Sequence, residues 1–101
     1  MKRPRYNFKS KVWLYQGQNA VWHFVSVPKK LSKEIRETFG GLARGWGSLP
    51  VEVTIGSTTW KTSIFPDKKS ETYLLPLKRD VRERAHVSSG QMVNIVLIVR
   101  V

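Results

Sequence analysis

Residues 51–65, VEVTIGSTTWKTSIF, carry the clearest structural signal in the chain. Every second residue from Val51 to Ile55 is apolar, the pattern of a strand with one face on a core. Gly56-Ser57 places glycine first, as one kind of two-residue hairpin turn requires, and residues 58–65 form the returning strand. The stretch therefore predicts an antiparallel hairpin at the centre of the chain.

The same alternation predicts four further strands, over residues 6–14, 20–27, 72–77 and 91–101. In the second of these, Val21, His23, Val25 and Val27 share one face, and Trp22 and Phe24 share the other. The last segment is largely apolar on both faces, so we expect it to be central in the sheet and buried on both sides.

Two short helices are predicted between the strands. Leu31, Ile35 and Phe39 recur at four-residue spacing, which indicates a helix over residues 28–39 with one stripe on the core. We expect Gly40-Gly41 to end it by adopting positive φ. The second helix is expected over residues 78–86.

Together these elements predict one mainly β domain over residues 1–101, a mostly antiparallel and nearly closed barrel with two short helices. Residues 1–5 form a basic arm, and residues 66–71 form an exposed loop. A faint repeat links residues 27–30, VPKK, to residues 76–79, PLKR, if a one-residue gap is allowed. It suggests that the barrel has two related halves.

Charge and composition restrict the function. The chain has 18 Lys and Arg against 7 Asp and Glu, a formal charge of +11, which favours polyanionic partners such as nucleic acid. The alternative is a solvated basic surface that keeps the domain soluble. Without cysteine the chain has no disulfide, thiol nucleophile or cysteine-based metal site. No signal-peptide or membrane-spanning segment is present, so a cytoplasmic protein without a membrane partner is expected.

Two sequence runs resemble an uncharacterised family. GWGSLPVEVTIG (45–56) and TWKTSIFPD (59–67) are similar to the central signature of the family called domain of unknown function nineteen-oh-five. Trp22-His23-Phe24 with Val27-Pro28, and YLLP at residues 73–76, fit it too, so the likeness covers nearly the whole chain. The resemblance implies a double-split β-barrel with two pseudo-equivalent halves and no established activity.

A second resemblance concerns the end of the chain. LPLKRDVR (75–82) with VSSGQMV (87–93) is similar to the second half of the swapped-hairpin domains of the AbrB and MazE type, although Leu77 interrupts the proline-basic entry. Those proteins bind DNA as dimers through paired basic hairpins. A shared fold does not by itself transfer that function.

The candidate binding residues are aromatic and basic. Trp13, Trp22, Trp46 and Trp60, with Tyr15 and Phe65, could be stacking platforms beside cations, as in single-strand binders, or they could be core and barrel rim. Trp13 and Trp46 are expected to be the most exposed. The predicted ligand-binding set is Arg44, Trp46, Trp60, Lys61, Trp22, His23 and Lys68, and the predicted nucleic-acid arm is Lys2, Arg3, Arg5, Lys9 and Lys11.

Other chemistry finds little support. The glycine-rich residues 40–48 could cradle a phosphate, but the stretch follows a helix and lacks the Lys-Ser/Thr ending of a Walker loop, so a helix cap and a tight turn are the favoured explanation. His23 and His86 do not have metal-ligand spacing, and no nucleophile or paired-carboxylate pattern is present. We expect Glu52 to point out of its strand and Asp67 to cap a turn.

The sequence thus predicts a non-enzymatic binding domain without metal or cofactor. Its expected partner is a polyanion, most plausibly nucleic acid, held by the arm and the loop around Trp46. The alternative is an accessory domain that binds a protein or a small ligand, with incidental positive charge. The oligomeric state stays open, with a monomer favoured.

Overall fold

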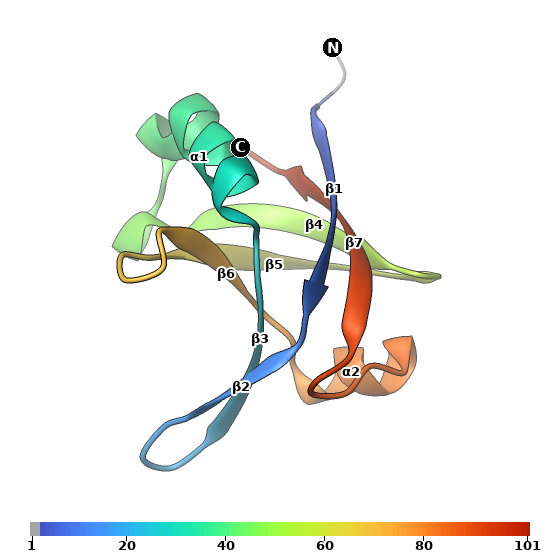
Figure 1. Cartoon of the computed structure of the whole chain (residues 1–101). Coiled ribbons are helices and arrows are strands. Elements are labelled where there is room, and N and C mark those ends of the chain that lie inside the picture. Colours follow the sequence, from blue (N-terminus) through green and yellow to red (C-terminus); the bar gives the residue numbers. More distant parts are fainter. Residues whose placement is uncertain (1–2) are drawn as a thin grey trace.

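A computed structural model describes residues 3–101 of the chain. Within that range, all strand pairs are antiparallel, and the strands form one sheet in the order β1-β7-β4-β5-β6-β3-β2 (Figure 1). The elements are β1 (Arg5–Lys11), β2 (Trp13–Gln16), β3 (Val21–Ser26), α1 (Lys29–Phe39), the 3-10 turns Gly40–Leu42 and Gly45–Gly47, β4 (Leu49–Ile55), β5 (Thr58–Asp67), β6 (Thr72–Pro76), α2 (Arg79–Ala85) and β7 (Met92–Val99).

The sheet curls because its first and last strands are neighbours in the sequence. β1 and β2 are separated only by Val12, yet they stand at opposite ends of the strand order. The Ser10 hydroxyl of β1 donates a hydrogen bond of 2.8 Å to the Ser26 carbonyl of β3, which links these two ends. The prediction of a mostly antiparallel barrel with two short helices is therefore confirmed.

Two segments each pair with one strand along their first part and with a different strand along their second part. Residues of β5 up to Ile64 pair with β4, and those from Phe65 onward pair with β6. The continuous segment β1–β2 changes partner in the same way, from β7 to β3, at Val12. Val12 and Ile64 are both buried, so the two crossing points lie in the core.

The chain consists of two pseudo-equivalent halves, as predicted. The first half is β1–β2, β3, α1 and β4, and the second is β5, β6, α2 and β7; exchanging them leaves every strand pairing unchanged. The hydrogen bonds agree, because the Val27 amide donates to the Tyr73 carbonyl and the Leu77 amide donates to the His23 carbonyl, each at 2.9 Å. Val27 is thus equivalent to Leu77, and His23 to Tyr73.

This equivalence corrects the predicted repeat. With Val27 opposite Leu77, no gap is needed, and Pro28 corresponds to Lys78 rather than to Pro76. What repeats is the path of the backbone: a helix begins directly after Pro28, at Lys29, and directly after Lys78, at Arg79.

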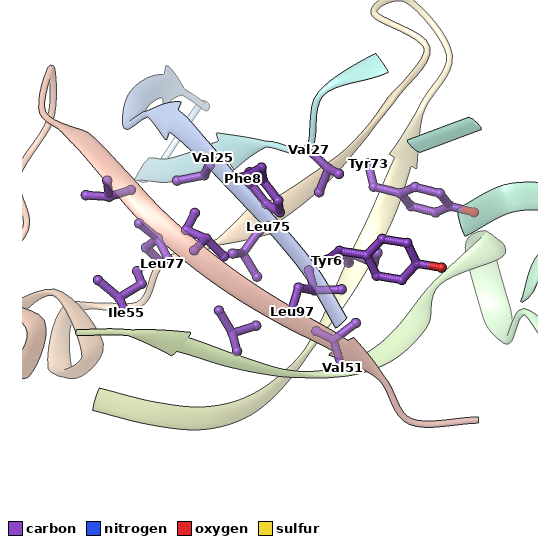
Figure 2. Packing of buried hydrophobic residues seen from close by; sticks show 14 of the residues in the cluster. Tyr6, Phe8, Val25, Val27, Val51, Ile55, Tyr73, Leu75, Leu77 and Leu97 are labelled. Atoms are coloured by element: carbon purple, nitrogen blue, oxygen red, sulfur yellow. The ribbon is translucent and has the colours of Figure 1, made fainter. Parts of the chain in front are cut away.

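The inward faces of the strands and one stripe of α1 form a single core (Figure 2). Residues predicted to share this core do so, with Phe39 half-buried at its margin and the others buried: Ile35, Val53, Ile55, Val93, Ile95 and Leu97. α1 contacts β6, whereas α2 contacts β5.

Two local predictions are wrong. Gly40 has φ −56°, and Gly41 is not among the positive-φ residues, so α1 runs on into a 3-10 turn instead of ending on a left-handed glycine. Pro66 and Asp67 belong to β5 rather than to a loop. Proline is tolerated here because β4 begins at Leu49, opposite Ile64, so residues of β5 beyond Ile64 have no β4 partner.

The open faces of the sheet account for two further corrections. β7 is central, but Met92 is 53% exposed on its outer face, because the helices pack on β5 and β6 instead. Leu14, expected on the buried face of the first strand, is 46% exposed, because the β2–β3 hairpin projects beyond the barrel (Figure 1).

Candidate functional site: an aromatic groove and a basic pocket

An open groove lies on the outer face of β2, β3, β6 and β5. Its volume is about 680 Å³. Because side chains alternate across a strand, residues opposite one another in the register share a face: Trp13 lies opposite Phe24, and Tyr15 opposite Trp22. We call this the aromatic groove, and its lining residues are Trp13, Tyr15, Trp22, Phe24, Phe65, Asp67, Lys69, Leu74 and Pro76.

The rings of the groove are held by one another. Phe24 lies between two indoles: the Trp13 and Phe24 centroids are 5.2 Å apart with the planes tilted by 40°, and Trp22 stacks on Phe24 at 6.2 Å and 7°. The Trp13 indole Nε1–H donates to the Ser26 hydroxyl at 3.0 Å. Trp22 and Tyr15 are 49% and 54% exposed, so these rings offer free faces on a fixed base.

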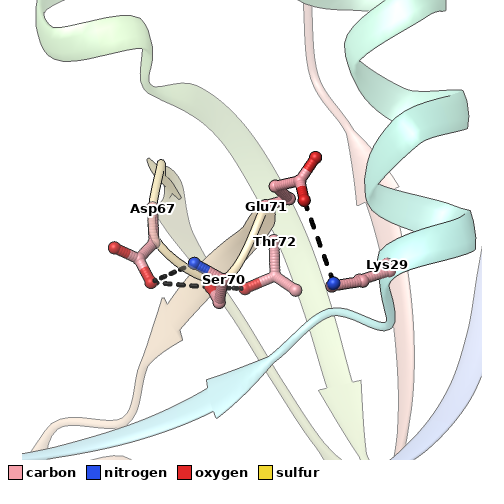
Figure 3. Close-up of polar contacts among 5 residues, drawn as sticks. All are labelled: Lys29, Asp67, Ser70, Glu71 and Thr72. Atoms are coloured by element: carbon pink, nitrogen blue, oxygen red, sulfur yellow. Dashed lines mark hydrogen bonds and ion pairs between the residues drawn. The ribbon is translucent and has the colours of Figure 1, made fainter.

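The β5–β6 turn, whose polar contacts are drawn in Figure 3, supplies Asp67 and Lys69 to the lining of the groove. The Asp67 carboxylate accepts hydrogen bonds from the Ser70 amide at 3.3 Å and the Ser70 hydroxyl at 2.6 Å. Asp67 therefore caps this turn, as predicted, and its carboxylate is already engaged. Lys69, in the same turn, lines the groove as well.

A second pocket adjoins the groove, with Trp22 and Pro76 in the walls of both. Its volume is about 250 Å³. The described residues around it include three cations and no carboxylate. We call it the basic pocket, and it is lined by Ala20, Val21, Trp22, His23, Pro76, Leu77, Lys78, Arg79 and Arg82.

His23 is the polar group with unmet hydrogen-bonding capacity in the basic pocket. Its Nδ1 atom is buried and has no hydrogen-bond partner among the described residues. Burial and the nearby Arg82 guanidinium lower the pKa of His23. Arg82 donates from Nη1 to the Leu77 carbonyl at 2.6 Å, which fixes the guanidinium near the imidazole. Both effects favour the neutral form of the ring.

Several predicted site residues lie apart because neighbours on a strand face opposite ways. Trp22 is on the outer face of β3, while His23 points inward. Trp60 is half-buried against the core, while Lys61 lies on the outer face opposite Glu52. Lys68 is in the β5–β6 turn, beside Tyr73 and Arg36 in a third pocket.

The loop before β4 stands away from the other predicted residues. Trp46 is 94% exposed and has φ 62°, a conformation that is costly for a bulky side chain. Its neighbour Gly47 packs on β5, where an added Cβ would lie 2.9 Å from the Pro66 ring. Arg44 is exposed in the same loop and donates its amide to the Ser48 carbonyl.

The predicted basic arm is divided. Lys2 lies outside the described residues, and Arg3 is exposed. Arg5 is already part of β1, and with Lys9 and Lys11 it lines the outer face of that strand. Lys61 of β5 lies on the same side of the sheet, three strands away from β1 in the strand order. Glu52 of β4 lies between Lys61 and the cations of β1.

The structure thus brings together four of the six proposed stacking residues. Trp13, Tyr15, Trp22 and Phe65 meet in the aromatic groove, whereas Trp46 and Trp60 do not line it. Phe24, Leu74 and Pro76 complete the groove and were missed. The sequence signal for them was that the outward-facing residues of β3 and β6 are apolar. Sequence alone does not distinguish such a face from a buried one.

The comparison with protein families matches residues 8–97 to the family described as Domain of unknown function (DUF1905). The chain belongs to this family. The DUF1905 match spans both halves of the barrel and includes the lining of the groove and the basic pocket. No curated protein matches the chain.

Among residues 3–101, no three His, Cys, Asp or Glu side chains gather as a metal site needs. In the same range, no helix has both the length and the apolar character to cross a membrane.

Proposed function

We propose that this domain binds single-stranded nucleic acid, with bases stacked on the aromatic groove. The observation that carries the proposal is the row of partly exposed rings on one sheet face, fixed from below by Phe24. Bases of any sequence have a flat π face, and stacking one base on an aromatic side chain contributes about 1–3 kcal/mol.

Charge supports the same partner. The domain carries a formal charge of +11, which attracts a polyanion from solution. At the groove itself, Lys69 lies at the turn end, and the cations of the basic pocket begin beyond Trp22 and Pro76. A strand along the groove would have bases on the rings and phosphates near cations at each end.

The proposal favours unpaired bases over a duplex. Base faces in a duplex are covered by their neighbours, so a row of half-exposed rings can stack only on a strand whose bases are free. The arm residues Arg5, Lys9 and Lys11 face another side of the barrel, where they would add attraction but no stacking.

The test is fluorescence anisotropy with a labelled oligothymidine and a duplex of equal length, between about 50 and 200 mM salt. We expect the single strand to bind more tightly, and Trp22→Ala to weaken it about tenfold at every salt concentration, since stacking responds little to salt. Trp60→Phe is the matched control, because Trp60 lies against the core.

Three results would count against the groove. Undetectable binding at low salt would remove the nucleic-acid function and favour a protein or small-ligand partner for this apolar surface. Equal affinity for duplex and single strand would indicate charge alone. Loss of binding in Trp46→Ala, with Trp22→Ala unchanged, would move the site to the loop before β4.

A further inference from the structure

The two halves provide an internal comparison for the basic pocket. The Ser32 amide donates to the Pro28 carbonyl, and the Arg82 amide donates to the Lys78 carbonyl. The Ser32 hydroxyl donates to the Val27 carbonyl, and the Arg82 guanidinium donates to the Leu77 carbonyl. Ser32 and Arg82 are therefore equivalent, as are Lys29 and Arg79 at the starts of the two helices.

The equivalent place beside α1 is closed. Ser32 is fully buried and also accepts a hydrogen bond of 3.0 Å from the Tyr73 amide. Tyr73, which corresponds to His23, is 3% exposed. The neighbouring pocket includes the carboxylates of Asp67 and Glu71, and Glu71 lies 3.9 Å from the Lys29 ammonium.

The place beside α2 is filled differently. Arg82 replaces the small serine, His23 replaces the buried tyrosine, and the pocket is lined by Lys78, Arg79 and Arg82 without a carboxylate, while Glu83, outside that lining, accepts a hydrogen bond of 3.1 Å from Arg79 Nε. Since the place beside α1 shows that the backbone accepts a closed arrangement, the three cations here are not a requirement of the fold. A recess in which cations outnumber the carboxylate beside them is suited to a phosphate.

We propose that the basic pocket holds a phosphate of the strand whose adjacent base stacks on Trp22. Trp22 and Pro76 form the shared wall, so a base in the groove and its own phosphate in the pocket are neighbours. Lys78, Arg79 and Arg82 supply the charge. This inference rests on the proposed function, and it sets the path of the nucleic-acid strand past Trp22.

The test compares one cation with its counterpart in the other half. Arg79→Ala and Lys29→Ala remove exposed charges from equivalent positions, each near one glutamate, Glu83 or Glu71. We expect Arg79→Ala to weaken oligothymidine binding about threefold to tenfold and to reduce the salt slope by about one, because one phosphate contact is lost. Lys29→Ala should change neither quantity.

A spectroscopic readout follows the pocket itself. On addition of oligothymidine, the His23 ring resonances should shift in NMR spectra, while those of His86, which does not line the pocket, should stay in place. Equal weakening by both alanine variants, or no effect of Arg79→Ala on a strand that still binds, would overturn the phosphate site and leave the groove proposal intact.

If the wild-type domain does not bind the strand, the proposed function fails and the pocket is tested alone. Inorganic phosphate is then the probe. A His23 shift that saturates with phosphate, and that is lost in the Arg79→Ala variant, would support an anion site. An unchanged His23 resonance would overturn it.

Discussion

The two halves of the barrel follow the same path but fill equivalent places differently. Beside α1, Ser32 and Tyr73 are buried, and the adjoining pocket includes carboxylates. Beside α2, Arg82 and His23 line a positive recess, in which the buried Nδ1 atom of His23 has no hydrogen-bond partner among the described residues. The comparison separates what the two places share from what only one of them contains.

The halves also differ in how their helices are attached. Ile35 of α1 is fully buried, whereas the equivalent residue of α2 is Ala85, which is only half-buried. α1 has 11 residues and α2 has 7. At this position α1 therefore places a larger and more deeply buried side chain than α2 does.

The largest expected effect is a loss of stability when α1, in the first half, is detached from the core. Ile35→Ala removes a fully buried side chain from the single core and should lower the free energy of unfolding by about 2–5 kcal/mol. Urea denaturation measures this, with Thr38→Ala, on an exposed position of the same helix, as the control. A loss below about 1 kcal/mol would mean that α1 is not anchored as described.

A smaller effect on stability should distinguish the equivalent residues Ser32 and Arg82. Ser32→Ala leaves the Tyr73 amide without its acceptor in a buried place and should cost about 1–3 kcal/mol. Arg82→Ala, beside the open basic pocket, should cost less, because water can reach the groups that it leaves. Equal losses in the two variants would contradict the distinction between the closed place beside α1 and the open one beside α2.

The third effect is a pH dependence that belongs to the basic pocket beside α2. The pKa of His23 is lowered by burial and by Arg82, below its ordinary value of 6.5, so the unfolded chain binds a proton more readily than the folded one. This contribution to stability is complete above about pH 6.5 and is lost as the pH falls through the folded pKa. The other charged groups that line the pocket around the ring are Lys78 and Arg79.

The measurement is the urea midpoint between about pH 7.5 and pH 5. His23→Gln should flatten the decline at low pH, and His86→Asn, at the left-handed end of α2, should not. A decline of the same steepness in His23→Gln would show that another group is responsible.

The smallest effect concerns the loop that connects α1 to β4. Asparagine tolerates the left-handed backbone of residue 46 better than tryptophan does, and the exposed indole makes little packing contact. Trp46→Asn should therefore leave the free energy of unfolding unchanged or raise it by up to about 1 kcal/mol. Calorimetry would detect the opposite result, a clear destabilisation, which would reveal packing by this ring.

Local periodicity predicted the strands and helices but not the partner exchange. The alternation from Val51 to Ile55 and the stripe of Leu31 and Ile35 depend on near neighbours in the sequence, and both were read correctly. The change of partner at Val12 depends on which strands lie alongside, and that information is not local. The same is true of Pro66, which lies in β5 only because β4 does not extend alongside it.

The candidate site was predictable in its residue types and not in its geometry. Sequence reasoning named Trp13, Trp22, Tyr15 and Phe65, but an apolar outer face looks like a second buried face until the helices are placed. The basic pocket could not be predicted without knowing that β3 pairs with β6. This pairing brings together His23 and Arg82, which are separated by more than half of the chain. The likeness to the AbrB-type half-motif stays a prediction.

The four tryptophans allow the central claim to be tested in one spectrum. Trp13 and Trp22 line the groove, Trp60 lies against the core, and Trp46 stands free in the loop. Each indole N–H gives its own signal in a nitrogen-15 NMR spectrum. On titration with oligothymidine, the account predicts that the signals of Trp13 and Trp22 shift together while those of Trp46 and Trp60 stay in place. A shift of Trp46 alone, or no shift at all, would contradict it.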